Sequence, residues 1–309
     1  MEWITSFLAA AVVAGTPLLF ATLGEIMTQK AGNLNLGVEG MMLMGAVIGF
    51  IAGFNTGNSV ISLLAAMAAG ALGALIYAFV TVTLKANQNV TGLTLTIFGT
   101  GFSSFIGKSV VGKVTPDSIK AFFSPIEIPL LSKIPILGKA LFSQDLFVYI
   151  GYICTILLTI YLYKTSKGLN LTAVGENPAA AAAASINVVL YKYVHILLGG
   201  ALCGLGGAYL SLVYVPAWQE NITAGRGWIA VALVVFAAWN PSKAIIGSFL
   251  FGGLDILRFR ITDSFISIYF MDMIPYILTI VLLVFVNIKK SNKNAPPKSL
   301  GVSYFREER

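Results

Sequence analysis

Stretches of about 20 apolar residues recur along this 309-residue chain, and they constrain its fold more than any other feature. A helix of that length spans the hydrocarbon core of a bilayer, which is about 30 Å thick. Backbone amides in lipid must find their hydrogen-bond partners within the protein, so a spanning segment is either a helix or part of a closed barrel. The alternating residue pattern of a membrane barrel is absent. The sequence therefore predicts an all-α polytopic membrane protein.

The composition supports this fold class and limits the partners. Hydrophobic residues make up 57% of the chain and charged residues only 11%, whereas soluble domains carry about 25% charged residues. The formal charge of +7 comes mostly from lysines at span ends and in the tail, where positive charge sets membrane orientation. We therefore expect lipid rather than nucleic acid around the chain. Cys154 and Cys203 lie within apolar segments and are expected to be packing residues.

We expect eight or nine crossings, forming one transmembrane domain over residues 1–288. The candidate segments are approximately 4–27, 41–54, 60–84, 93–107, 146–163, 188–215, 227–239, 244–257 and 274–288. One long connector, 108–145, alternates turn residues with short apolar pieces, which is typical of a surface loop with an interfacial helix near its end. The final residues, 289–309, form a polar tail that we expect to be partly disordered.

Lysines predict the orientation. Lys289, Lys290 and Lys293 immediately follow the last candidate span, so we expect the tail to be cytoplasmic. Counting back through the spans puts the connector 164–187 on the same side, and the N-terminus and the loop 108–145 outside. That outer loop also contains five lysines, which three acidic residues only partly offset. The prediction therefore depends on the tail and on the lysines that begin the 164–187 connector.

The segment "TAVGENPAAAAAASINV" (172–188) encodes a short helix. Asn177 is a favourable N-cap, and Pro178 suits the first helical position, where no backbone N–H is needed. Alanine is the strongest helix former, and Asn187 can interrupt the helix before the next span. We expect two or three helical turns over about 176–188. The helix is either a connector between spans or a docking element for a cytoplasmic protein.

Two polar stretches are candidates for a solute path. Polar, glycine-containing sequence at membrane depth is tolerated where it lines a cavity or is buried in protein, so "AGNLNLGVEG" (31–40) is either a broken helix beside a path or an ordinary loop with Asn caps. "NQNVTGLTLT" (87–96) places amides and hydroxyls along a span, either lining a path or bonding to neighbouring helices. The path candidates in and beside these stretches are Asn33, Asn35, Glu39, Asn89, Thr94, Thr96 and Phe98.

Other motifs constrain the chemistry. Glycines at four-residue spacing, at 45, 49, 53 and 57 and again at 200 and 204, predict closely packed helices. No nucleophile elbow, zinc motif or phosphate-binding glycine loop occurs. We therefore expect no enzymatic activity, no metal and no cofactor bound by this chain.

Four stretches resemble a known family. "AGNLNLGVEGMMLMGA" (31–46), "GENPAAAAAASIN" (175–187), "GGALCGLGGAYLSL" (199–212) and "GRGWIAVALVVFAAWNPSKAIIGSFLFGG" (225–253) resemble permease subunits of bacterial ABC importers. The branch is that of branched-chain amino acid, simple sugar and nucleoside uptake. Within it, "LKANQNVTGLTLTIFGTGFSSFIG" (84–107) is similar to the shorter nucleoside-type permease.

The resemblance implies a transporter of several subunits in the bacterial cell membrane, each with its own role. Cytoplasmic ATPase subunits would bind ATP–Mg, a second and longer permease would complete the pore, and an extracytoplasmic binding protein or lipoprotein would deliver the solute. It also implies that 176–188 is the coupling helix, which docks on the ATPase. The residues expected to carry this coupling are Gly175, Glu176, Asn177, Pro178, Ala179, Ala182, Ala183 and Ile186.

Nucleosides are the expected solute, and simple sugars or branched-chain amino acids are the alternative solutes. The alternative function is a secondary transporter. A secondary transporter would show inverted repeats with matched broken helices and coupling carboxylates in the membrane. The sequence of the second half offers no evident mate for the break at 31–40.

Overall fold

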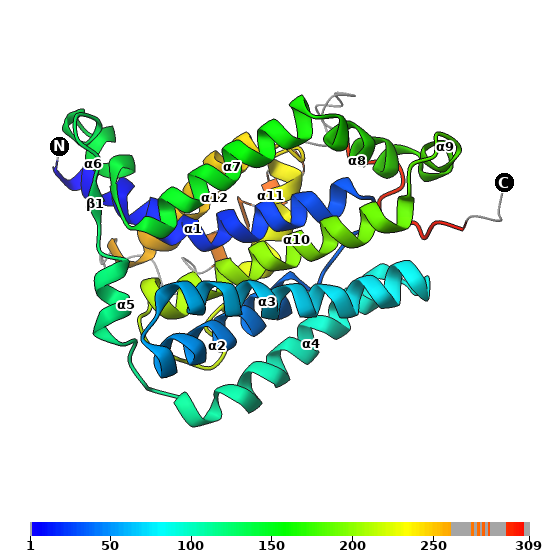
Figure 1. Ribbon diagram of the computed structural model, residues 1–309. Helices are drawn as coiled ribbons and strands as arrows, with labels where there is room; N and C mark the ends of the chain where they lie inside the picture. Colours follow the sequence, from blue (N-terminus) through cyan, green and yellow to red (C-terminus); the bar gives the residue numbers. More distant parts are fainter. Residues whose placement is uncertain are drawn as a thin grey trace.

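The computed structural model describes residues 2–260 and 295–305, together with a few positions between 273 and 284. The expected last span, 274–288, lies for the most part outside the described residues, as do 289–294 and 306–309 of the tail. Long helices lie side by side and give an elongated bundle (Figure 1). Across the described ranges the strands amount to one pair of two residues each, β1 (Ile126–Glu127) and β2 (Ser143–Gln144).

Six helical segments are long and apolar enough to cross a membrane. They are α1 (Glu2–Lys30), α2 (Val38–Thr56), α3 (Ser59–Ala78) with η1 (Phe79–Thr83), α4 (Gln88–Gly107) with η2 (Lys108–Val110), α7 (Leu146–Lys164), and α10 (Val188–Tyr209) with η4 (Leu210–Tyr214). The all-α polytopic fold is thereby confirmed, and the chain is a multi-pass membrane protein. Eight or nine crossings stays a prediction.

The remaining described elements connect or complete these spans. They are α5 (Asp117–Phe122), η3 (Leu131–Lys133), α6 (Leu137–Phe142), α8 (Ser166–Glu176), α9 (Pro178–Ala183), α11 (Arg226–Phe236) and α12 (Pro241–Arg260). The loop 108–145 contains α5, η3 and α6, so the expected helix near its end is present as the six-residue α6. At 11 residues α11 is about 16 Å long, too short for the crossing expected over 227–239.

Glycines hold α10 against three neighbours at the centre of the bundle. A Cβ added to Gly204 would lie 2.3 Å from the Ala66 carbonyl oxygen of α3, and one added to Gly45 of α2 would lie 2.3 Å from the Gly204 Cα. The backbones therefore touch directly, and dispersion between them replaces side-chain packing. The predicted glycine packing is correct at 45, 49, 53, 200 and 204. Gly57 instead ends α2 in a left-handed conformation, with φ of +64°.

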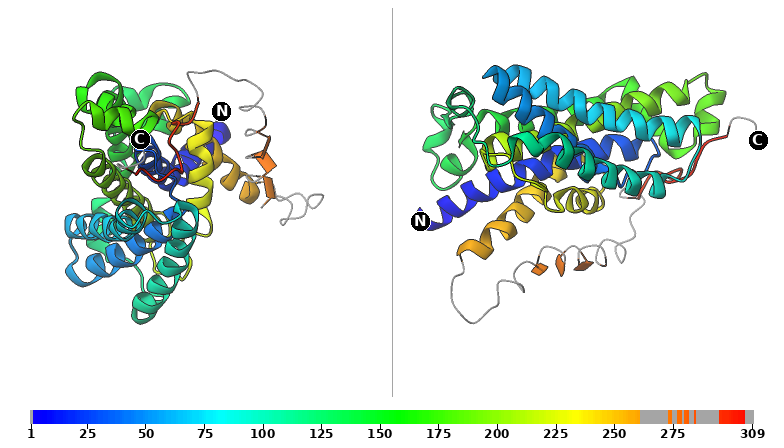
Figure 2. Two further views of the ribbon diagram at one scale, coloured as in Figure 1. Left: turned by 90° about the vertical axis from the view of Figure 1, so that its right-hand side faces the viewer. Right: turned by 90° about the horizontal axis from the view of Figure 1, so that it is seen from below.

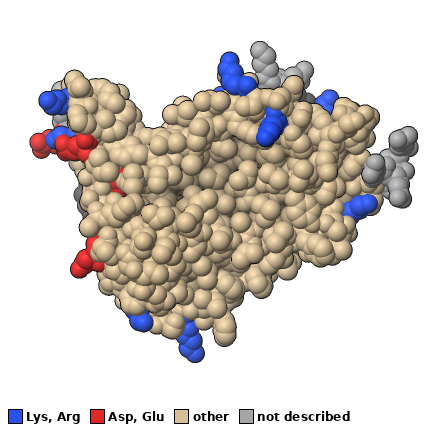
Figure 3. Space-filling model, in the orientation of Figure 1, with Lys and Arg blue, Asp and Glu red and all other residues tan. Residues whose placement is uncertain are grey.

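The bundle has two chemically different ends. The loop end carries the N-terminus and the loop 108–145, and the α9 end carries α8, α9 and residues 295–305 (Figures 1 and 2). The face in Figure 3 shows acidic side chains only towards the loop end. Lysines from several elements lie at the α9 end: Lys30, Lys85, Lys164, Lys167, Lys192, Lys243 and Lys298. The loop 108–145 contributes five lysines to the loop end, together with Asp117, Glu127 and Asp145.

The described part of the tail is attached to the α9 end. Ser299 donates to the Gly175 carbonyl oxygen from its backbone N–H at 3.0 Å and from its hydroxyl at 2.6 Å. Ser303 donates to the Lys85 carbonyl oxygen at 3.4 Å, and the Lys85 ammonium lies 4.4 Å from the Phe305 ring centroid. Residues 295–305 therefore join α8 to the turn between α3 and α4.

Candidate functional site

The alanine-rich helix forms by the capping chemistry read from the sequence. The Asn177 side chain accepts from the Ala180 N–H at 3.0 Å, and Pro178 is the first helical residue. The helix α9 ends at Ala183, before Ser185 adopts a φ of +63°, so its six residues are fewer than the two or three turns expected. The helix α8, capped by Thr165, precedes it and was not predicted.

Seven of the eight coupling candidates reach the surface at the α9 end to some extent. Glu176, Asn177, Ala179 and Ala183 are exposed, and Pro178, Ala182 and Ile186 are partly exposed. Gly175 is buried, because a Cβ there would lie 2.2 Å from the Lys30 carbonyl oxygen. It fixes α8 to α1 and the tail. The exposed alanines of α9 thus form a small, uncharged, ordered surface at this end.

The polar segment 31–37 lies inside the bundle. It is the non-helical connection between α1 and α2. Glu25 of α1 accepts from the Asn35 N–H at 3.1 Å and from the Gln29 amide at 2.8 Å, and Gln29 in turn accepts from the Trp239 indole at 2.7 Å. Asn35 closes a local turn by accepting from the Gly37 N–H at 2.8 Å. Asn33 and Asn35 are both buried. The segment 31–37 is therefore buried within the protein and includes an Asn turn, and its position beside a solute path stays a prediction.

Glu39, in the first turn of α2, joins this break to α11. Its carboxylate accepts from the Thr223 hydroxyl, from the Gly225 N–H at 2.8 Å and from the Gly227 N–H at 2.6 Å. The α11 N-terminus presents unpaired N–H groups and a positive helix dipole, both of which favour a carboxylate. Next to Glu39, Gly40 packs against Leu95 and Gly99, near the middle of α4, so the contact lies well within the bundle.

The second half of the chain therefore contains a break that faces the first one. Residues 216–218 form backbone hydrogen bonds with Thr115 and Lys113 at the loop end. The chain then runs back into the bundle, where 223–227 contact Glu39. Gly225 adopts a φ of +84°, and a Cβ on Gly227 would lie 2.5 Å from the Glu39 backbone. The sequence signal was the pair of glycines in "GRG" directly before an apolar run, which was not recognised as a break.

An ion pair adjoins this contact. Arg226 donates to Asp255 of α12 at 2.9 Å, with both side chains mostly buried, and its guanidinium lies 5.5 Å from the Tyr214 ring centroid. A planar, permanently charged group between a carboxylate and an aromatic face is held in one orientation. Sequence reasoning missed Arg226, because its partner follows 29 residues later.

Three of the four candidates on α4 are separated from the buried ones. Thr96 donates to the Leu36 carbonyl oxygen at 2.9 Å and so bonds to the break in the first half. Asn89, Thr94 and Phe98 are exposed on the outer face of α4, where Phe98 stacks on Phe102 with ring centroids 6.1 Å apart. The seven path candidates therefore form two groups, one buried around the break and one on the exposed face of α4.

The sole histidine, His195, has both ring nitrogens engaged, with Tyr161 at 2.7 Å and the Tyr191 carbonyl at 2.6 Å. Within the ranges that the structure describes, no three His, Cys, Asp or Glu side chains gather as metal ligands. The features that stand out are two helix breaks in contact and one exposed capped helix.

Comparison with known proteins identifies relatives along nearly the whole chain. The family model for the permease component of branched-chain amino acid transport systems matches residues 7–286. The chain is 36% identical over 328 residues to the putative glucose ABC transporter permease protein TsgC13 of Haloferax volcanii, covering 99% of each chain. It is 33% identical over 323 residues to the guanosine ABC transporter permease protein NupQ of Bacillus subtilis, covering 100% of this chain and 99% of that one. The nucleoside ABC transporter permease protein NupC of Lactococcus lactis is 32% identical over 308 residues, covering 96% of both.

Proposed function

Because the chain belongs to the family of permease components of branched-chain amino acid transport systems, we propose that it forms half of the path by which an ATP-driven importer takes up nucleosides. It is the pore-forming permease subunit of an ABC transporter rather than an enzyme, and such a system works with ATPase and substrate-binding subunits. We place ATP–Mg in the ATPase partner.

The exposed helix α9 is the observation that carries the coupling role. It is capped, a left-handed residue (Ser185) follows its C-terminal end, and it presents Ala179 and Ala183 at the surface. Small side chains allow close approach of a second protein surface, and a short ordered helix loses little conformational entropy on docking. The lysines at the same end favour a cytoplasmic location for α9 and the tail, by the positive-inside rule.

The facing helix breaks support a conformational role for Glu39. Its hydrogen bonds join residues 184 to 188 positions apart, so movement of α11 relative to α2 must break them or carry both helices together. In the proposal, a displacement of α9 passes through α10 and α1 to this pair of helices. Separation of α2 from α11, or movement of the two helices together, would open the solute path.

The exposed face of α4 supports a second permease as the other half of the pore. Phe98, Thr94 and Ile97 point away from the bundle, and Ile97 is 74% exposed. In a heterodimer with a longer permease, this face would line the path instead of facing lipid.

Nucleosides fit that face better than the alternatives do. A nucleoside has a flat base, which stacks on aromatic rings, and a ribose, which bonds to hydroxyls and amides. Phe98 with Phe102, and Thr94 with Asn89, provide both kinds of group on one helix. Two of the three relatives described above are named for nucleoside or guanosine transport. The third is named for glucose, so simple sugars are the second candidate, ahead of branched-chain amino acids.

Capture of the ATPase subunit tests the coupling role. Ala183→Arg places a long charged side chain on the exposed face of α9, and Ala121→Arg makes the same change on exposed α5 at the loop end. We expect Ala183→Arg to reduce ATPase capture at least tenfold while the membrane fold is kept, and Ala121→Arg to leave capture unchanged. Equal capture by both variants would contradict the proposal.

Competition during uptake tests the solute. In cells that depend on this importer, excess guanosine, glucose or leucine is added against a radiolabelled nucleoside. We expect the nucleoside alone to compete, and Phe98→Ala to raise the half-saturating concentration because a stacking surface is lost. Competition by glucose at equal concentration would favour the sugar assignment.

A further inference from the structure

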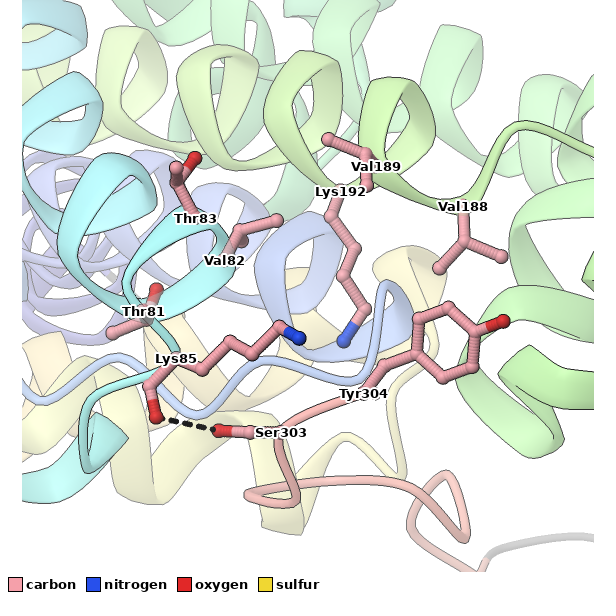
Figure 4. Close-up of a pocket in the computed structure, with 9 residues that line it drawn as sticks. All are labelled: Thr81, Val82, Thr83, Lys85, Val188, Val189, Lys192, Ser303 and Tyr304. Atoms are coloured by element: carbon pink, nitrogen blue, oxygen red, sulfur yellow. Dashed lines mark hydrogen bonds between the residues drawn. The ribbon is translucent and has the colours of Figure 1, made fainter. Parts of the chain in front are cut away.

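A groove of about 310 Å³ lies at the α9 end, between the end of α3, the start of α10 and the docked tail (Figure 4). Two lysines from different elements enter it: Lys85 from the turn after η1, and Lys192 from the second turn of α10. In Figure 4 their ammonium groups point towards one another across the groove. The rest of the lining is neutral: Thr81, Val82, Thr83, Val188, Val189, Ser303 and Tyr304.

Lys192 is the unusual member of this site. Its side chain is 3% exposed, and among the described residues it has neither an ion-pair partner nor a hydrogen-bond acceptor. Burial of an ammonium without a counter-charge is unfavourable, so lysines in such places are normally paired. The pairing group is therefore expected to come from outside the described chain.

Lys85 adds a second positive charge to the groove from the opposite wall. Its backbone is held in the left-handed region, with φ of +58°, and Ser303 donates to its carbonyl oxygen. The ammonium lies over the Phe305 ring, which leaves its N–H groups free to donate to another group. Two ammonium groups directed into one space repel each other unless an anion lies between them.

The neutral wall does not supply that anion. Thr81 donates its hydroxyl to the Tyr77 carbonyl oxygen at 2.7 Å, and the Thr83 hydroxyl pairs with that of Tyr193. Six ammonium N–H donors thus face a groove whose Thr81, Thr83 and Ser303 hydroxyls are already engaged and whose remaining hydroxyl, that of Tyr304, is neutral.

We propose that this groove binds a phosphate-bearing anion, whose oxygens accept from Lys85 and Lys192 together. Phosphate presents several strong acceptor oxygens and more than one negative charge, which matches two converging ammonium groups. Basic pockets between membrane helices at the cytoplasmic surface are suited to acidic lipid headgroups. The volume also accommodates a soluble phosphate, so the two sources share the same recognition chemistry.

The groove lies next to α9. The proposal that it binds an anion does not depend on the proposed transport function. Val188 and Val189 line this groove and also a larger hollow, of about 600 Å³, beside α9. An occupant would therefore hold the tail, α10 and the α3–α4 turn together next to α9.

Thermal unfolding of the purified full-length chain in neutral detergent tests the proposal. The chain is titrated separately with phosphatidylglycerol, with phosphatidylcholine and with inorganic phosphate. We expect the unfolding midpoint to rise by several degrees with phosphatidylglycerol or with phosphate, but not with phosphatidylcholine, because a ligand that binds only the folded state stabilises it. A rise with phosphatidylglycerol alone identifies a lipid headgroup, and a rise with phosphate alone identifies a soluble anion.

Variants connect the response to the groove. Lys192→Met keeps the side-chain volume, Lys85→Asn tolerates the left-handed backbone, and Lys164→Met removes an exposed lysine at the same end as a matched control. We expect the apparent affinity for the stabilising anion to fall at least tenfold in the first two and to be unchanged in the third. No response to either anion, or an equal loss in Lys164→Met, would overturn the proposal.

The carboxylates that follow Phe305 in the sequence are tested in the same way. Substituting Glu307→Gln together with Glu308→Gln leaves the anion response equal to that of the unmodified chain if the occupant is external. A response seen only in this double variant would assign the groove to the tail itself and refute external binding.

Discussion

Replacing Glu39 by glutamine tests the contact that joins α2 to α11. The substitution keeps the shape of the side chain and removes its charge. Glu39 accepts three hydrogen bonds, two at one oxygen and one at the other, and all the donors are buried or partly buried. Glutamine has a single acceptor oxygen, so its amide group must face at least one of these donors.

The expected loss follows from the hydrogen bonds. A hydrogen bond to a charged group contributes about 1.5–3 kcal/mol, and one between neutral groups about 0.5–1.5 kcal/mol. Glu39→Gln loses one charged bond outright and turns two others into neutral ones. It also removes the favourable interaction with the α11 dipole. We expect the free energy of unfolding to fall by about 3–5 kcal/mol.

Thermal unfolding of the purified chain, followed by circular dichroism, measures this loss. A fall of that size corresponds to roughly 6–15 °C in the unfolding midpoint for a chain of this class. Thr223→Val removes one donor and should cause a smaller fall, while Glu2→Gln, at an exposed acid, should cause none. A Glu39→Gln midpoint within about 1 °C of the unmodified chain would refute the inference that the carboxylate holds the two breaks together.

Three further substitutions have definite expected outcomes. Gly204→Ala would put a Cβ 2.3 Å from a backbone oxygen of α3 and should cost about 1–3 kcal/mol or more in a denaturant titration, whereas Gly101→Ala, with nothing within 4 Å, should be neutral or slightly stabilising. Asp145 caps α7, and burial raises the pKa of its carboxyl group. The folded chain therefore favours the protonated carboxyl. The stability that comes from this preference is present at low pH and is lost as pH rises through the raised pKa. The stability of Asp145→Asn relative to the unmodified chain should therefore increase as pH rises above about 4, and a difference that stays constant with pH would be inconsistent with the raised pKa. Asn177→Ala should cost α9 about 0.5–2 kcal/mol, seen as faster amide exchange at Ala180, while Asn177→Asp should preserve the cap.

Local chemistry explains what could be predicted from the sequence. The α9 helix depends on an N-cap, a proline and alanines within seven residues, so its start was correct. The all-α fold follows from the apolar lengths, and the close packing of α10 from glycine spacing. The helix α8 was missed because "SKGLNLTAVGE" lacks a clear apolar period.

Distant contacts explain the rest. Glu39 was singled out as a polar residue near the membrane interior, but its partners at 223–227 cannot be identified without knowing how the helices pack. For the same reason α11 was expected to cross the membrane, although it begins inside the bundle. The two groups of path candidates could be separated only once the glycine face of α4 was seen to pack on α2, which leaves Phe98 and Thr94 on the opposite side.

ATP-dependent accumulation of a radiolabelled nucleoside in proteoliposomes tests the central claim most directly. The vesicles contain this chain with the ATPase, the second permease and the binding protein of the proposed importer. We predict accumulation only when ATP is present on the ATPase side, its loss in Ala183→Arg, and its retention in Ala121→Arg. Uptake by this chain alone, driven by an ion gradient without ATP, would contradict the account.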